Sequence, residues 1–323
     1  MRQQLVLPVL VALGLTALHA APARAQSPQT PEGECHRCLG EFRFLPSSIV
    51  GDPFATTYFE NATGGGMALD LKVPVRNLAG ETVDSLRGDI GFLLLDFTYQ
   101  KSVARWLALR TNVTAIGRVG TSTEAVVASG ASAAFAGSLG ATVPLLSRPS
   151  FLVSAVGDLR SGKEYEIDPY GFARSIVDEG YSPEAKETLL GSVKVNRWSL
   201  GVRGAWALQP WIGLSGLVES GLVTKTSSDS KSLSTFAAQA AFDLDRRFQF
   251  PLGISLAYRG QVGEGRKGNL NGGYRTIETG LYYTGRSAFV IGGEALFSRL
   301  ASRDASVEDL DALQIRLLTR IDF

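Results

Sequence analysis

Charged side chains recur at alternate positions of short apolar segments, on the face opposite the apolar residues. Successive side chains of a β-strand point to opposite faces, so these charges would share one side of a sheet. Inside a closed sheet they could form ion pairs that fill and stiffen the interior. They could instead line a water-filled path that selects solutes by charge. The candidate lining residues are Asp96, Arg110, Arg118, Asp158, Arg197, Arg203, Glu219, Asp243, Arg259, Glu278, Glu294, Arg316 and Arg320.

The only two cysteines, Cys35 and Cys38, stand close together near the N-terminus. In an oxidising compartment this pair predicts a small local disulfide. His36 lies between them and leaves a metal site as an alternative, but these residues are too few for a closed site, so we expect no metal. A c-type haem site requires His directly after the second Cys, where Leu39 stands, and we expect no cofactor.

Twelve segments of alternating polarity supply the strands that would hold the charged side chains. They span residues 67–75, 89–99, 106–118, 132–145, 151–160, 193–208, 211–224, 232–244, 250–262, 274–283, 287–297 and 309–323. Short links at 100–105, 146–149, 209–210, 245–249 and 285–286 alternate with longer ones. Outer-membrane barrels combine an even strand number with short periplasmic turns and longer outer loops. The pattern predicts an all-β fold, a closed antiparallel transmembrane β-barrel of about twelve strands.

Aromatic residues gather at the ends of the segments that meet the short links. They are Tyr99, Trp106, Phe151, Trp211, Phe248, Phe250, Tyr283 and Phe323. An aromatic girdle at the membrane interface belongs at this level of a barrel. The apolar faces of the strands would then meet lipid.

Residues 309–323 alternate between an apolar and a polar face, and the chain ends on Phe323. A final strand of this kind resembles the closing strand of bacterial outer-membrane β-barrels. The resemblance is architectural, covers residues 67–323 and names no subfamily. It implies that Phe323 belongs to the signal read by the barrel-assembly machinery, and that lipid and lipopolysaccharide surround the barrel. Arg316 and Arg320 would face the lumen, with Glu294 on the neighbouring strand as a candidate partner.

The resemblance to outer-membrane β-barrels does not indicate an enzyme. Outer-membrane enzymes of this architecture depend on a His as general acid or base. The two histidines of this chain, His19 and His36, precede every predicted strand. We therefore expect that the protein is not an enzyme.

The N-terminus predicts export from the cytoplasm. Arg2 precedes an apolar run over residues 5–18, and Ala23, Arg24 and Ala25 form an A-x-A cleavage site, so residues 1–25 read as a secretory signal peptide. Loss of Arg2 and Arg24 lowers the basic residues from 32 to 30 against 31 acidic ones, a net charge of −1. This balance gives no case for nucleic acid, and the expected location is the cell outer membrane.

Residues 26–66 are rich in aromatics but hold no long periodic segment, and Pro46, Pro53 and the glycines at 64–66 interrupt them. They could form a periplasmic extension or a plug inside the barrel. Side chains can just fill the interior of an eight-stranded barrel, so twelve strands with many small inward residues leave room for water, a ligand or a plug. We favour the plug, which gives a signal peptide, a segment over 26–66 and a barrel over 67–323.

The longest link, residues 161–191, is rich in Asp and Glu, and Ser182 followed by Pro183 predicts the start of a short helix. The simplest interpretation is a solvated outer loop. It could alternatively fold into the lumen as a constriction, or bind divalent cations at the lipopolysaccharide surface.

These features together predict a passive channel or uptake protein for a small solute. The alternative is a structural or adhesive surface barrel whose lumen is closed.

Overall fold

The structure is a computed structural model, and it describes residues 35–76, 82–122, 126, 131–167, 190–225, 231–263, 274–300 and 310–323. The elements are β1 (Cys38–Leu39), β2 (Phe42–Arg43), β3 (Tyr58–Arg76), β4 (Thr82–Ala104), β5 (Leu107–Gly120), β6 (Ala131–Arg148), β7 (Phe151–Ile167), β8 (Leu190–Gln209), β9 (Ile212–Lys225), β10 (Lys231–Asp243), α5 (Leu244–Phe248), β11 (Leu252–Gly263), β12 (Tyr274–Tyr283), β13 (Phe289–Leu300) and β14 (Leu310–Asp322). Within these ranges no helix has the length and apolar character needed to cross a membrane.

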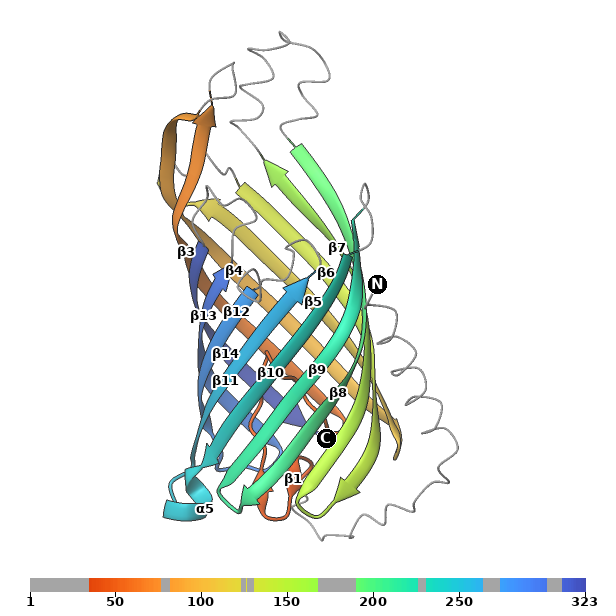
Figure 1. The fold of residues 1–323 in the computed structure, drawn as a ribbon. Helices are drawn as coiled ribbons and strands as arrows, with labels where there is room; N and C mark the ends of the chain where they lie inside the picture. Colours follow the sequence, from red (N-terminus) through yellow and green to blue (C-terminus); the bar gives the residue numbers. More distant parts are fainter. Residues whose placement is uncertain are drawn as a thin grey trace, which may run out of the picture.

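Strands β3 to β14 form a closed antiparallel barrel in which every strand pairs with its neighbours in the chain (Figure 1). The ring closes between the last strand and the first, where Leu317 is paired with Thr63 and Ile321 with Phe59. Closure gives each strand two hydrogen-bonded neighbours, so no sheet edge is left to be solvated. The predicted fold class, a closed antiparallel barrel of about twelve strands with an N-terminal segment that is not part of the barrel sheet, is confirmed.

The outer face of the barrel is apolar and uncovered. Leu93 is 72% exposed, Val218 68% and Ile315 64%, and they come from strands far apart around the ring. A patch of this extent is unfavourable in water, whereas lipid accommodates it. At the end of the barrel that carries the short turns, Trp106, Phe248 and Phe323 are also exposed, at the level predicted for an aromatic girdle.

The first barrel strand begins at Tyr58, so the predicted start of the barrel at Met67 is too late. The glycines at 64–66 predict a break, but in the structure they lie within β3. A Cβ atom on Gly64 would lie 2.4 Å from the Cβ of Arg316, and one on Gly66 would lie 2.4 Å from Cζ of Phe92. The same Cβ atoms would lie 2.3 Å from backbone oxygens of β14, that of Ile315 at Gly64 and that of Leu313 at Gly66. These glycines therefore permit the close approach of β14 and of neighbouring side chains, and they do not end the strand.

Several other strands are longer than predicted. Strand β4 starts at Thr82 inside the predicted link 76–88, and it continues through Gln100 to Ala104, inside the predicted short link 100–105. Strand β7 extends to Ile167 and β8 starts at Leu190, inside the predicted link 161–191. Apolar alternation marks only the lipid-facing band, while hydrogen-bonded pairing continues beyond it. The helix predicted after Ser182 falls outside the described residues.

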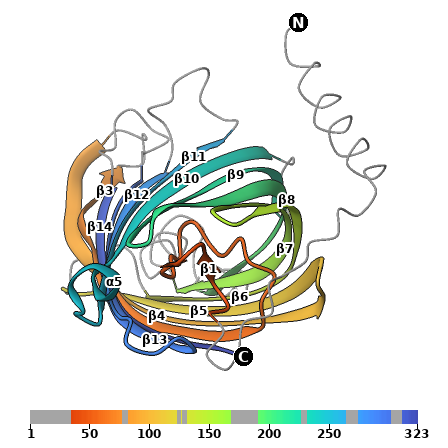
Figure 2. The same ribbon diagram turned by 90° about the horizontal axis from the view of Figure 1, so that it is seen from below.

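Residues 35–57, called the plug from here on, lie inside the barrel at the short-turn end (Figure 2). The hairpin of β1 and β2 and the disulfide between Cys35 and Cys38 belong to the plug. The disulfide occupies the thiols of both cysteines. The hairpin turns at Gly40, whose φ of 56° suits glycine, and the Gly40 N–H donates to the carbonyl of Pro149 in the β6–β7 turn.

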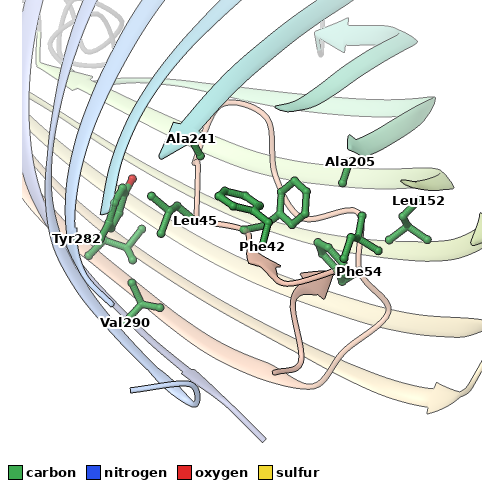
Figure 3. Packing of buried hydrophobic residues seen from close by; sticks show 11 residues of the cluster. Phe42, Leu45, Phe54, Leu152, Ala205, Ala241, Tyr282 and Val290 are labelled. Atoms are coloured by element: carbon green, nitrogen blue, oxygen red, sulfur yellow. The ribbon is translucent and has the colours of Figure 1, made fainter. Parts of the chain in front are cut away.

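Apolar side chains of the plug form the largest buried cluster in the molecule that the structure describes. Phe42, Phe44, Leu45 and Phe54 pack together and touch opposite sides of the barrel wall (Figure 3). On the wall the contacts are Leu152, Ala205, Ala241, Tyr282, Val290 and Leu318. These wall positions alternate along their strands with lipid-facing ones. At the level of the plug, the inward positions are therefore apolar as well, and they pack against the plug.

Candidate functional site

A cavity of about 420 Å³ lies in the lumen, directly above the plug. Nine of the predicted lumen residues line it: Asp96, Arg110, Asp158, Arg197, Arg203, Glu219, Arg259, Arg316 and Arg320. The plug contributes Arg37 and residues 46–52, which form the floor. The cavity is therefore bounded by the barrel wall and by the N-terminal segment, and most of its charged side chains are arginines.

Four predicted residues lie elsewhere in the interior. Glu278 and Glu294 are buried and do not line the cavity, and Asp243 caps α5 at the short-turn end, where it accepts from the Asp245 N–H. Arg118 is paired in register with Ser132 further towards the long-link end of β5. The structure thus brings most, but not all, of the predicted set together.

One side of the cavity is rich in arginine. Arg110 donates through Nη2 to both oxygens of Asp158, at 2.6 and 2.7 Å. Arg203 approaches the same carboxylate less closely, at 3.8 Å. Arg197 and Arg259 share Glu219, at 2.5 and 3.7 Å.

Arg160 also lines this side of the cavity. Among the described residues no carboxylate lies within 4.0 Å of its guanidinium, the limit for an ion pair. The set Arg110, Arg160, Arg197, Arg203 and Arg259 is called the arginine wall below. Its side chains come from β5, β7, β8 and β11.

The opposite side of the lumen, on β12, β13, β14 and β3, pairs its arginines fully with acids. Arg316 contacts Glu278 at 3.2 Å and forms a closer ion pair with Glu294, as the sequence suggested. Tyr282 donates its hydroxyl to the same Glu294 at 2.7 Å. Because β14 lies six strands from β8 around the twelve-membered ring, Arg316 faces Arg197 and Arg203 across the lumen, whereas Arg259 lies on β11, next to β12.

Arg320 links this second side to the plug. Its guanidinium lies 2.6 Å from Asp52 of the plug, 2.8 Å from Asp322 and 3.4 Å from Glu60. It also stacks over the ring of Tyr58 at 3.5 Å. Asp52 is 4% exposed, so both partners of the contact are removed from bulk water.

Asp52 is held as an anion inside the plug. Burial raises the pKa of its carboxyl, but the positive charges of Arg37 and Arg320 outweigh burial and lower the pKa below its ordinary value. Arg37 lies 3.1 Å from the same oxygen of Asp52 that Arg320 contacts. The plug is thus fixed above its apolar core by a buried ion cluster shared with the wall.

A second polar contact fixes the base of the plug. The guanidinium of Arg43 donates to the carbonyls of Thr284 at 3.1 Å and Ser287 at 2.8 Å, and to Arg286, in the turn between β12 and β13. Burial, and then the neighbouring charge of Arg37, lowers the pKa of Arg43 to about 10, so Arg43 stays charged at neutral pH. Side chains of the wall also satisfy plug carbonyls, since Gln100 donates to Phe54 and Ser154 to Pro53.

The sequence did not predict that Glu60, Arg37 and Asp52 belong to the lumen. Glu60 lies before the predicted start of the barrel, although Phe59 outward and Glu60 inward continue the alternation of β3. Arg37 and Asp52 lie in a segment without periodicity, so no pattern could assign them to the lumen. The aromatic content of the segment was the only signal that it is packed.

A closed antiparallel barrel with an apolar outer face and a charged interior is the architecture of a bacterial outer-membrane β-barrel. Neither protein-family models nor curated protein sequences match this chain. Similar solved structures include the translocator domain of the autotransporter NalP from Neisseria meningitidis, with 8% identity over 83% of this chain and 88% of that one, at a TM-score of 0.49. The β domain of the Bordetella autotransporter BrkA shares 9% identity over 83% of this chain and all of that one, at 0.49.

The NanC porin structure shares 6% identity over 80% of this chain and 98% of that one, at a TM-score of 0.47. At these values the comparisons assign neither a subfamily nor a ligand.

Proposed function

We propose that the protein is an outer-membrane channel for uptake of a small solute, with the plug closing its periplasmic end. The observation that carries the proposal is the charged cavity of about 420 Å³ between the plug and the long-link end of the barrel. Ligand sites for small molecules have volumes of about 300 to 1,000 Å³, so the cavity has a suitable size. A barrel that served only as an anchor would not need a polar chamber above a packed floor.

The orientation follows from the loops. Outer-membrane barrels carry short turns on the periplasmic side and longer loops outside the cell. The plug contacts the short turns at Pro149 and Thr284, so solute would reach the cavity from outside and leave only when the plug moves. On this proposal the signal peptide directs the chain across the inner membrane, Phe323 belongs to the signal read by the barrel-assembly machinery, and lipopolysaccharide surrounds the outer rim.

A surface barrel with a permanently closed lumen is the second candidate. The apolar packing of Phe42, Leu45 and Phe54 against the wall favours it, because such a plug would not leave readily. The two candidates differ in one property. A channel conducts once the plug is absent, whereas a permanently filled barrel need not enclose a continuous path.

Solute flux into liposomes tests the proposal. A deletion of residues 35–54 removes the plug but keeps Thr57, whose carbonyl accepts the Phe323 N–H at the junction with β3. We expect the deleted barrel to admit small solutes faster than the full-length protein. No flux from a deleted barrel that still shows heat-modifiable migration and a β-type circular dichroism spectrum would contradict the proposal.

A further inference from the structure

The arginine wall carries more positive charge than the acids around it neutralise. Four of its arginines share the carboxylates of Asp158 and Glu219, and Arg160 has none within 4.0 Å among the described residues. Asp96 is the third carboxylate on this side of the cavity, but its oxygens accept from Asn112 and Thr114, each at 2.7 Å. The wall therefore offers unused hydrogen-bond donors and net positive charge to the cavity.

Arg203 is the clearest case. It is 5% exposed, and its Nε has no hydrogen-bond partner in the described structure. Its other contacts are long, 3.4 Å to the carbonyl of Asp52 and 3.8 Å to Asp158. A buried guanidinium without close anionic partners is costly, and an incoming anion would relieve that cost.

The acids across the lumen lie against arginines, and the one buried carboxylate oxygen there without a hydrogen-bond partner in the described structure, Oε1 of Glu278, belongs to a residue that does not line the cavity. Glu278 and Glu294 are occupied by Arg316, and Asp52 is occupied by Arg37 and Arg320. An entering cation would compete with these buried pairs, whereas an entering anion meets the arginine wall, where Arg160 has no carboxylate within 4.0 Å among the described residues. The distribution of charge around the cavity therefore favours an anionic solute over a cationic one.

We infer that the arginine wall binds a small oxyanion, a carboxylate or phosphate group of the transported solute. A planar guanidinium donates two parallel N–H bonds to such a group, and several guanidiniums on one wall can bind it together. The inference rests on the proposed function, because it names the solute class for the same cavity. Gly51 of the plug lies against the Arg203 guanidinium, where an added Cβ would be 2.9 Å from Cζ, so the bound anion would also touch the floor.

Calorimetric titration of the full-length protein tests the site. The probes are succinate and inorganic phosphate, with uncharged 1,4-butanediol as the matched control for succinate. We expect both anions to bind and the diol not to bind. Arg160→Gln removes a charge that holds no ion pair among the described residues, and it should weaken binding about tenfold. Arg299→Gln removes the same charge at the exposed pair with Asp311 and should leave binding unchanged.

Equal binding of the diol, or equal affinity in Arg160→Gln, would overturn the inference. A measurement of ion selectivity distinguishes failure of the oxyanion site from failure of the proposed channel. In a salt gradient the barrel without residues 35–54 should prefer anions, and Arg160→Gln should reduce that preference. A deleted barrel that conducts without preferring anions would refute the oxyanion site and leave the channel standing. A deleted barrel that does not conduct, while the full-length protein binds succinate through Arg160, would refute the channel and leave the site.

Discussion

Asp52 forms ion pairs both with Arg37 of the plug and with Arg320 of the barrel wall. It lies 268 positions from its partner Arg320, and it comes from a segment with no periodic pattern. Alternation along a strand sorts inward from outward side chains, because a strand has only two faces. It cannot supply partners that arrive from a non-strand segment. The sequence could therefore suggest the contact of Arg316 with Glu294 on an adjacent strand, but not the contact of Arg320 with Asp52.

Asp52→Asn should loosen the plug without opening the barrel. The amide cannot pair with Arg37 or Arg320, and breaking a buried pair costs about 3 kcal/mol or more. We expect proteolysis of the plug in the folded protein to accelerate about a hundredfold. Asp311→Asn, at the exposed pair with Arg299, is the control and should change the cleavage rate little. Identical rates in both variants would refute the role of Asp52.

The same pair predicts release of the plug by acid. The pKa of Asp52 is lower in the folded protein than the ordinary value of 3.8. Its contribution to stability is therefore complete above about pH 4 and is lost as the pH falls through the folded pKa. Plug proteolysis by an acid-active protease should rise on acidification in the natural protein and rise less in Asp52→Asn. A loss of protection between pH 5 and 8 would contradict this sign.

At the scale of elements, glycines on the inner face of the barrel wall leave space that side chains of the plug occupy. A Cβ on Gly213 of β9 would lie 2.1 Å from Cε1 of Phe42, and one on Gly253 of β11 would lie 2.7 Å from Cδ1 of Leu45. Small inward residues predicted spare volume, and the plug fills that volume at the short-turn end. Which glycines receive the plug could not be predicted, because glycine also marks bulges and turns. For the same reason the glycines at 64–66 predict a break, although β3 begins before them at Tyr58.

Gly213→Leu should displace the plug, because the new side chain would occupy the position of the Phe42 ring. Gly117→Leu is the matched control, since an added Cβ at Gly117 meets nothing within 4 Å. We expect faster proteolysis of the plug and higher solute flux in Gly213→Leu only. Both variants should keep the heat-modifiable migration of a folded barrel. Equal behaviour of the two would show that the plug is not seated against β9.

Strands β12, β13 and β14 are joined inside the barrel by Glu278, Glu294 and Arg316. Arg316→Met leaves two carboxylates buried without their cation, which should lower the free energy of unfolding by about 3 to 5 kcal/mol. Arg299→Met breaks an exposed pair and should cost about 1 kcal/mol or less. Denaturant unfolding in detergent or lipid measures the difference. Equal midpoints for the two variants would contradict a structural role for the buried cluster.

At the scale of the whole molecule, the sequence determines the barrel more completely than the lumen. Strand number, strand direction and the lipid-facing side follow from alternation and link lengths, because a membrane permits few alternatives. The lumen is set by the path of residues 35–57, which depends on contacts with β4, β7, β8 and β12 to β14. Closed and open lumens are both compatible with the same twelve-stranded wall, so only the packing of the plug decides between them.

Conductance across planar bilayers tests the central claim, a solute path closed by the plug. The full-length protein and the barrel lacking residues 35–54 are compared under the same salt and voltage. We expect the full-length protein to be closed for most of the recording, and the deleted barrel to show stable open steps. Stable steps of equal size from both proteins would contradict closure by the plug. No steps from a correctly folded deleted barrel would contradict the channel itself.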